Sequence, residues 1–270
     1  MRISFIGAGA MGEAMISAII RQGTIIPNDI WVSEIDSSRL AALVKKHGVN
    51  SVSDNRQAIE GADITVLAVK PQSLATVLQE LKGKVKAEQL IISIIAGAKI
   101  SKIAKGMEHN LIARAMPNTP AQVGAGISVW TTTHYVSDTQ KESARNILAA
   151  LGKEIYVSDE KYIDMATAVS GSGPAYIFLI MEALIDSGVH IGLTRGMATE
   201  LTVETVFGSA KMARESGKHL VALRDMVTSP GGTTAEGLLC LEEGGIRAIM
   251  AQAVIAAYEK AKHLGKEDSK

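Results

Sequence analysis

The segment that most constrains the fold is a glycine-rich turn close to the N-terminus. A short apolar run, Arg2 to Ile6, leads directly into Gly7-Ala8-Gly9-Ala10-Met11-Gly12, and a helical apolar pattern follows. In a strand–turn–helix unit of this spacing, the first glycine makes the tight turn and the second allows close approach of a pyrophosphate. The third lets the helix pack on the strand. Unpaired N–H groups at the helix N-terminus attract phosphate. The pattern therefore predicts a dinucleotide-binding unit.

Residues 1–158 have the alternating pattern of a doubly wound α/β domain. Short apolar runs alternate with amphipathic stretches, which is typical of βαβ units and a parallel sheet. The predicted strands are Arg2–Ile6, Ile30–Ser33, Ile64–Val69, Leu90–Ile95, Leu111–Ala115, Gly126–Thr131 and Glu154–Val157. The predicted helices include Arg39–His47, Leu74–Leu81 and Lys141–Leu151. We expect a Rossmann-type parallel sheet with helices on both faces.

Residues 159–270 are predicted to be helical, because the strand pattern stops near Tyr162. The predicted helices are Pro174–Val189, Thr194–Ser216, Leu220–Thr228, Thr233–Glu243 and Ile246–His263. Breaks are expected at glycines that suit helix ends, namely Gly188/Gly192, Gly217, Pro230-Gly231-Gly232 and Gly244-Gly245. The first of these helices is apolar on nearly every side from Tyr176 to Met181. We therefore expect an all-helical C-terminal domain that buries this surface in a dimer or a higher oligomer.

Composition excludes several classes of function. Lys+Arg and Asp+Glu both number 28, and this balance argues against a nucleic-acid partner. One cysteine, Cys240, gives no internal disulfide and no thiolate cluster, so we expect no metal site. The richest apolar run, Pro174 to Ile185, contains Glu182, so no membrane span is expected. A strand and a phosphate turn occupy the place of a signal peptide. We expect a cytoplasmic protein with a small-molecule substrate.

Residues after the second and third strands are candidates for the cofactor crevice. Glu34 stands where an acid would hydrogen-bond the ribose 2′-hydroxyl of NAD, whereas Ser33 and Ser37-Ser38-Arg39 could hold a 2′-phosphate. Glu34 could also be an ordinary loop charge. Lys70-Pro71 ends the third strand beside the crevice, although a proline there is also common at the start of a helix. The stiff loop Met116–Pro120 could wall the nicotinamide or simply be rigid.

The segment Ser229–Thr234 (SPGGTT) is the candidate substrate loop. A helix that starts after Pro-Gly-Gly presents backbone N–H groups and two hydroxyls, which suit a carboxylate. The alternative is ordinary N-capping by Thr233 or Thr234. Asn is absent after Asn146, and Lys is absent between Lys161 and Lys211. The Lys/Asn pair with which β-hydroxyacid dehydrogenases deprotonate an alcohol is therefore missing from the first long helix. A protonated imine, which needs mainly positioning, suits such a site.

Taken together, these segments resemble the pyrroline-5-carboxylate reductase family over essentially the whole chain. The matching segments, in order, are FIGAGAMGEA, AVKP, AMPNTPAQVGAG, VSGSGPAY, GSAKM and DMVTSPGGTTAEGL. The resemblance implies a Rossmann domain, a helical dimerisation domain, and dimers that assemble further into decamers. It implies NAD(P)H-dependent reduction of L-1-pyrroline-5-carboxylate to L-proline, the last step of proline biosynthesis. Another cyclic-imine reductase, an F420-type nicotinamide reductase and a non-catalytic nicotinamide sensor are the alternatives.

The resemblance also assigns roles to residues. The pyrophosphate would be held by Ile6, Gly7, Ala8, Gly9, Ala10 and Met11. Ser33 and Asn55 match positions on the adenosine side, and the nicotinamide ribose would lie along Ala68, Val69, Lys70 and Pro71. The substrate carboxylate would be held by Ser229, Gly231, Gly232 and Thr233. Thr234 matches the catalytic threonine whose hydroxyl hydrogen-bonds the ring nitrogen.

Cofactor preference is where the chain departs from the resemblance. Many members of the family have serine, threonine, asparagine or arginine just after the second strand, which favours NADPH, whereas this chain has Glu34. We expect use of both cofactors, with NADPH ahead of NADH on the grounds of the resemblance.

Overall fold

The structure, a computed structural model, describes residues 1–267. The chain forms two compact units. Unit 1 consists of Met1–Ser172 together with the last part of the chain from Ala256, and unit 2 is Gly173–Ile255.

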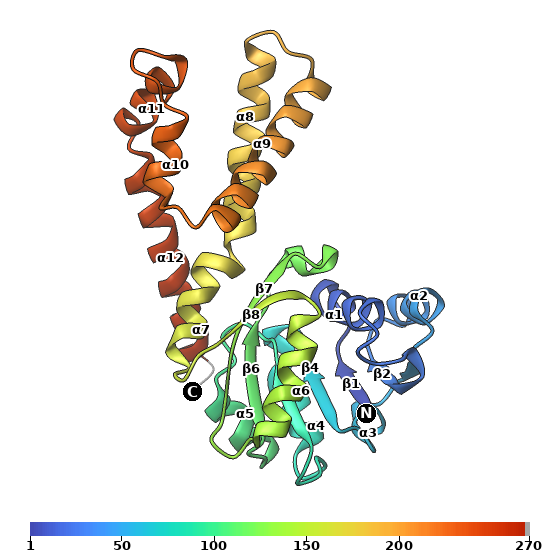
Figure 1. Cartoon of the computed structure of the whole chain (residues 1–270). Helices are drawn as coiled ribbons and strands as arrows, with labels where there is room; N and C mark the ends of the chain where they lie inside the picture. Colours follow the sequence, from blue (N-terminus) through green and yellow to red (C-terminus); the bar gives the residue numbers. More distant parts are fainter. Residues whose placement is uncertain (268–270) are drawn as a thin grey trace. The chain divides into compact units, whose positions relative to one another are not determined.

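The core of unit 1 is a single sheet (Figure 1). Within residues 1–267, eight strands lie in the order β3-β2-β1-β4-β5-β6-β7-β8. Strands β3 to β6 in this order are parallel, β7 is antiparallel to β6, and β8 is parallel to β7. The strands are β1 (Ile3–Ile6), β2 (Ile30–Ser33), β3 (Asn50–Val52), β4 (Ile64–Leu67), β5 (Leu90–Ser93), β6 (Ile112–Met116), β7 (Gly126–Thr132) and β8 (Gly152–Tyr156).

The sheet confirms the predicted α/β class and corrects it in detail. The expectation of a purely parallel sheet is wrong at β7. The link from β6 contains only the 3-10 turn Thr119–Val123, which is too short for a helical crossover. The strand β3 was not predicted, because its three residues, Asn50 to Val52, are too few and too polar to show a period. The predicted third strand ends at Leu67, which leaves Ala68 and Val69 in a loop.

Helices cover both faces of the sheet. They are α1 (Ala10–Arg21), α2 (Ser37–His47), α3 (Asn55–Ile59), α4 (Leu74–Leu81), α5 (Ile100–Met107), α6 (Asp138–Ala149) and α7 (Lys161–Ala166). Further 3-10 turns span Pro27–Asp29 and Pro71–Ser73, and a π-helical turn spans Thr167–Gly171. The helices α3 and α5 were not predicted, and α3, with five residues, is too short for the sequence period to reveal it.

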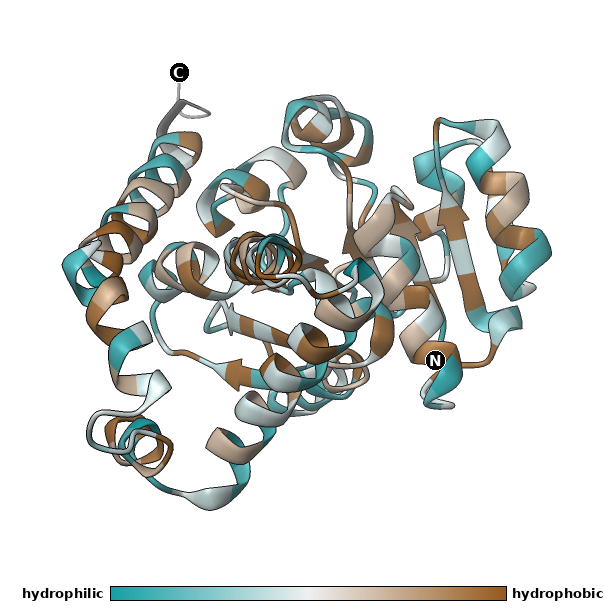
Figure 2. Ribbon diagram, turned by 90° about the horizontal axis from the view of Figure 1, so that it is seen from above, coloured by the Kyte–Doolittle hydropathy of each residue, from teal (hydrophilic) through white to brown (hydrophobic). Residues whose placement is uncertain are grey.

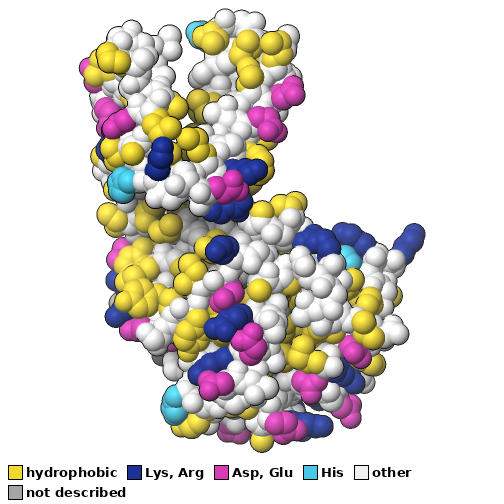
Figure 3. Space-filling model, viewed as in Figure 1, with side chains coloured by type: hydrophobic (Ala, Val, Ile, Leu, Met, Phe, Trp, Pro, Cys, Tyr) yellow, Lys and Arg dark blue, Asp and Glu magenta, His cyan; other side chains and the backbone are white. Residues whose placement is uncertain are grey.

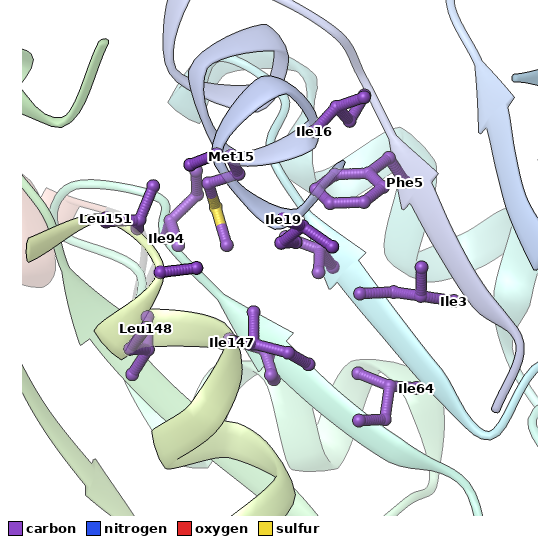
Figure 4. Packing of buried hydrophobic residues seen from close by; sticks show 14 of the residues in the cluster. Ile3, Phe5, Met15, Ile16, Ile19, Ile64, Ile94, Ile147, Leu148 and Leu151 are labelled. Atoms are coloured by element: carbon purple, nitrogen blue, oxygen red, sulfur yellow. The ribbon is translucent and has the colours of Figure 1, made fainter. Parts of the chain in front are cut away.

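Each face of the sheet has its own hydrophobic core, because successive strand residues point to opposite sides. Ile3 and Phe5 of β1 belong to one cluster and Ile6 to the other. The first cluster, seen from close by in Figure 4, includes residues of α1 and α6, namely Met15, Ile16, Ile19, Ile147 and Leu148. The second includes residues of α3, α4 and α5, namely Ile59, Leu74, Leu78, Ile103 and Met107.

A buried ion-pair cluster ties α7 to the sheet. The guanidinium of Arg114, on β6, donates from Nη1 to Glu160 Oε1 and from Nη2 to Asp164 Oδ1, both at 2.7 Å. Glu160 Oε1 also accepts the backbone N–H of Ile100 at 2.8 Å. The Arg114 side chain is 2% exposed. The negative charges of Glu160 and Asp164 are balanced by this buried cation. Removing the arginine would leave them without a compensating charge.

Unit 2 is helical throughout. Its helices are α8 (Gly173–His190), α9 (Arg195–Ser216), α10 (Leu220–Met226), α11 (Thr233–Glu243) and the first part of α12 (Ile246–Glu267). Along α12, hydrophobic and hydrophilic residues alternate (Figure 2). The predicted break at Gly217 is confirmed, since it ends α9 with φ 65°. Gly188 lies inside α8 instead of ending it, and a Cβ there would stand 3.1 Å from Ala198 Cβ on α9.

Many apolar side chains of unit 2 are exposed in the single chain (Figure 3). On α8, Phe178 is 62% and Leu179 is 66% exposed. Within the described residues, the continuous helical stretch Lys161–His190 is, by length and composition, able to cross a membrane, since it contains an 18-residue window with a mean hydropathy of 1.5. The expectation concerned an uninterrupted apolar segment, and this stretch contains the charged residues Asp164, Glu182 and Asp186. The absence of a membrane span therefore stays a prediction.

Replacing Arg114 with methionine is predicted to lower the free energy of unfolding by about 3–5 kcal/mol, because two largely buried carboxylates lose their cation. Lys82→Met is the control. Lys82 pairs with Glu108 at 3.0 Å, but both side chains are more than half exposed, so a loss below about 1 kcal/mol is expected. Urea unfolding at one protein concentration measures both. Equal losses in the two variants would contradict the role of the buried cluster.

Candidate active site

The glycine-rich turn after β1 is packed directly against the segment after β4. Gly7 has φ 90°, and a Cβ at this position would lie 2.9 Å from the carbonyl oxygen of Ala68. The Gly7 N–H donates to Ser33 O at 2.8 Å, and the Ala68 N–H donates to Ile6 O at 2.8 Å. The ends of β1, β2 and β4 therefore meet at Gly7, where a side chain would not fit.

The protein's own packing requires a glycine at position 12 but not at position 9. A Cβ at Gly12 would lie 2.9 Å from Gly7 O, so this glycine is needed for the packing of α1. Gly9 has φ −62° and ψ −176°, which any residue can adopt. A Cβ at Gly9 would meet only Arg39 Nη1, at 4.0 Å. The protein's own packing does not explain Gly9, whereas close approach of a pyrophosphate does. The turn therefore fits a dinucleotide.

A cavity of about 490 Å³ opens at the carboxyl ends of β1, β2 and β4. It brings together eight residues that the sequence singled out: Gly7, Gly9, Ser33, Glu34, Asn55, Ala68, Val69 and Lys70. Arg39, which the sequence offered as a candidate for a 2′-phosphate, also lines it. The remaining lining residues were not indicated by the sequence: Ile35, Asp36, Gln72, Ser73, Thr76, Val77 and Glu80. Parallel-sheet folds of this order bind ligands at this switch point.

Part of the cavity wall follows from Pro71. The sequence offered two roles for Lys70-Pro71, a place beside the crevice or the start of a helix. Pro71 starts a 3-10 turn, and Lys70, the N-cap of that turn, lines the cavity. The turn leads into α4, which brings Thr76 and Glu80 to the wall. A helix period indicates α4 in the sequence, but only the fold shows that its first turns face the cavity.

Glu34 is fixed to the glycine turn. Its Oε2 accepts the backbone N–H of Ala8 at 2.8 Å, and its Oε1 accepts the N–H of Asp36 at 3.1 Å. This carboxylate therefore bridges the turn after β1 and the segment after β2, and it is not an unattached loop charge.

Two other polar residues of the cavity are also committed to protein partners. Asp36 caps α2, where it accepts the N–H groups of Ser38 and Arg39 and the Ser38 hydroxyl. The Ser38 hydroxyl, followed by the Arg39 N–H, lowers the pKa of Asp36, so the carboxylate is ionised at neutral pH. The Asn55 amide donates to Glu80 Oε2 at 2.6 Å. This end of the cavity is thus rich in carboxylates.

The loop Met116–Pro120 has an internal role. The Asn118 side chain accepts the N–H of Ile127 at 2.9 Å and donates to the carbonyl of Ser170 at 3.1 Å. Ser170 belongs to the π-helical turn Thr167–Gly171. Asn118 therefore links the end of β6 to the turn that precedes α8.

The candidate substrate loop in unit 2 begins α11. Gly232 is the N-cap of this helix and no side chain caps it, so N-capping by Thr233 or Thr234 is not observed. Among the described residues, neither hydroxyl has a hydrogen-bond partner. Gly231 has φ 66°, and a Cβ on Gly232 would collide with Ser229 Oγ. The glycines thus hold a turn at which the first N–H groups of a helix and two hydroxyls remain available.

Comparison with known proteins shows the family. Pyrroline-5-carboxylate reductase of Synechocystis is 41% identical over 99% of both chains. The Escherichia coli enzyme of the same name is 39% identical over 98% of both. The chain belongs to the pyrroline-5-carboxylate reductase family. A model described as pyrroline-5-carboxylate reductase dimerisation matches residues 160–264. A model described as NADP oxidoreductase, coenzyme F420-dependent, matches residues 2–97, the Rossmann part alone.

Solved structures of the reductase family have the same fold. The pyrroline-5-carboxylate reductase of Coxiella burnetii is 42% identical with a TM-score of 0.89, and the alignment covers 97% of this chain and 98% of that one. The Plasmodium falciparum pyrroline carboxylate reductase, solved with NADP bound, is 34% identical with a TM-score of 0.90 and covers 98% of each chain. These similarities confirm a Rossmann half followed by a helical dimerisation half.

Gly9→Ala is predicted to weaken cofactor binding without loss of stability. The free energy of unfolding should stay the same or rise by up to about 1 kcal/mol, because alanine fits this backbone conformation. The dissociation constant for NADH and NADPH should rise on the order of tenfold or more, since the added methyl group occupies the place of the pyrophosphate.

Gly7→Ala is the matched control, in which the added methyl group collides with backbone at φ 90°. It should lower the free energy of unfolding by about 1–3 kcal/mol. Calorimetric titration and urea unfolding separate the two effects. Unchanged cofactor affinity in Gly9→Ala would argue against the pyrophosphate position.

Proposed function

We propose that the chain reduces the C=N bond of L-1-pyrroline-5-carboxylate to give L-proline, with NADPH or NADH as the reductant. Membership in the reductase family supports this activity. One observation about the site carries the assignment furthest. The helix α11 begins at Gly232 without a side-chain cap, although two threonines stand in its first turn. A carboxylate would satisfy the helix N-terminus that the protein itself leaves open.

The residues of unit 1 bind the cofactor in this proposal. Ile6 and the turn Gly7–Met11 hold the pyrophosphate, Ser33 and Asn55 lie on the adenosine side, and Ala68–Pro71 hold the nicotinamide ribose. The nicotinamide, when bound, supplies the hydride. Support for this arrangement comes from the cavity that seven of these residues line and from the open space at Gly9.

The residues of unit 2 bind and orient the substrate. Ser229, Gly231, Gly232 and Thr233 hold the carboxylate through backbone N–H groups and hydroxyls, and the Thr234 hydroxyl hydrogen-bonds the ring nitrogen. A protonated imine already accepts a hydride readily, so the site needs orientation more than an acid or a base. The chain fits this requirement, since the Lys/Asn pair of alcohol dehydrogenation is missing from α8. Thr234 is half-buried with no partner for its hydroxyl among the described residues.

A second subunit covers the exposed apolar surface of unit 2. The dimerisation model begins at residue 160, which supports a boundary between a cofactor domain, 1–158, and a substrate and dimerisation domain, 159–270. The stretch Lys161–His190 then packs against protein instead of lipid, and Glu182 and Asp186 within it suit this setting better than a bilayer. The proposed enzyme is a cytoplasmic dimer, and its dimers assemble further into decamers.

Thr234→Ala is predicted to lower kcat/KM for pyrroline-5-carboxylate by roughly 10- to 150-fold. A hydrogen bond to a charged group is worth about 1.5–3 kcal/mol, and it is lost in this variant. Thr234→Ser keeps the hydroxyl and should recover most of the activity, whereas Thr234→Val should not. Steady-state kinetics measure all three. Full activity in Thr234→Ala and Thr234→Val would remove the threonine from the mechanism.

Light scattering after gel filtration should give at least twice the mass of one chain at micromolar concentration, without detergent. Phe178→Glu should lower this mass, because a charge enters the covered apolar surface of α8. Val123→Glu is the control in unit 1, where the valine is 76% exposed, and it should leave the mass unchanged. A wild-type monomer, or a protein that stays dispersed only in detergent, would refute the proposed assembly.

A further inference from the structure

The carboxylate of Glu34 lies where its charge can discriminate between two cofactors. It follows β2, and the preceding residue, Ser33, accepts the N–H of Gly7 through its carbonyl oxygen. Both Glu34 oxygens accept backbone N–H groups, from Ala8 at 2.8 Å and from Asp36 at 3.1 Å. Glu34 also lines the cavity at the carboxyl ends of the strands. The negative charge is therefore held in place beside the glycine turn.

Three donors at the start of α2 that could hold a 2′-phosphate already have a protein partner. The N-terminus of α2 is capped by Asp36, which takes the N–H groups of Ser38 and Arg39 at 3.0 and 3.1 Å. The Ser38 hydroxyl donates to the same carboxylate at 2.6 Å. A phosphate at this end of the cavity would thus meet two carboxylates, Glu34 and Asp36, and would find these three donors already engaged.

The nearby cation, Arg39, lies over the glycine turn, and its charge adds to the effect of the Ser38 hydroxyl in lowering the pKa of Asp36. Its guanidinium Nη1 lies 4.0 Å from the place of a Cβ on Gly9. It forms no ion pair within the described residues. Since the space above Gly9 suits the pyrophosphate that all nicotinamide dinucleotides share, Arg39 at this place attracts NADH and NADPH alike.

We propose that Glu34 is the residue that sets cofactor specificity, and that it makes this chain prefer NADH to NADPH. The carboxylate accepts a hydrogen bond from the ribose 2′-hydroxyl of NADH, and it repels the 2′-phosphate of NADPH. Arg39 contributes affinity for both cofactors without discriminating between them. This inference rests on the proposed function only for the choice of cofactor class.

The test is the dissociation constant of NADH and of NADPH, measured by titration calorimetry on the purified oligomer without imine substrate. The wild type should bind NADH roughly tenfold or more tightly than NADPH, because a hydrogen bond to a charged acceptor is gained with one cofactor only. Glu34→Ser should reduce this ratio by a similar factor and should bind NADPH more tightly than the wild type does. Equal wild-type affinities would overturn the proposal.

Glu34→Gln separates charge from structure. Glutamine keeps an acceptor for the Ala8 N–H and loses the one for the exposed Asp36 N–H, so the thermal unfolding temperature should fall only slightly, while the preference for NADH falls because the negative charge is gone. If Glu34 only stabilised the glycine turn, Glu34→Ser would weaken the binding of NADH and of NADPH equally. The ratio of the two dissociation constants would then stay unchanged, which would refute the proposal.

Arg39→Gln is the control for the neighbouring cation. It should weaken the binding of both cofactors by the same factor. A loss of affinity for NADPH alone would overturn the proposal, because it would assign the 2′-phosphate to Arg39. Because binding is measured without imine, the outcome does not depend on the reaction. A chain that binds NADH with this preference yet fails to reduce pyrroline-5-carboxylate would support the proposal and would refute the proposed function.

Discussion

The contact on which the site depends is the backbone approach of Gly7 to Ala68. The strands β1 and β4 end at this point, and the turn fits against the next segment only because Gly7 lacks a side chain and has φ 90°. Gly12 continues the same contact by letting α1 lie on Gly7 O. These two glycines create the crevice, while Gly9 leaves it open. A cofactor site is therefore built into the backbone before any side chain contributes to it.

Much of this half could be predicted from the sequence, because its signals are local. The glycine spacing, the apolar runs and the Pro-Gly breaks depend on neighbouring residues, and they gave α4 its observed bounds, Leu74–Leu81. Other features depend on contacts between distant residues. The bond from Ala8 to Glu34 spans 26 positions and the one from Asn55 to Glu80 spans 25, so no periodicity reveals them. The reversal at β7 follows instead from the short link after β6, and the three residues of β3 are too few to show a period.

In the helical half, the sequence predicts the helices but not what covers their surfaces. The helices can be recognised in the sequence, but α8 has no single polar face. A single chain does not explain why apolar residues such as Phe178 and Leu179 are exposed on α8, whereas a partner subunit that covers them does. The substrate loop was the one ambiguous motif in this half, since threonines at a helix start commonly serve as caps. The structure removes that alternative at Gly232, and what remains is a helix N-terminus open to an anion.

Glycines build the cofactor crevice of unit 1, and the substrate loop of unit 2 is a helix start without a cap. We propose that the enzyme uses both to reduce a cyclic imino acid. The most direct measurement follows the oxidation of NADH and NADPH by the purified wild-type chain when L-1-pyrroline-5-carboxylate is added, with identification of the product. The account predicts oxidation that depends on the imine and yields L-proline in equal amount. No oxidation with either cofactor, in a folded oligomer that binds them, would contradict it.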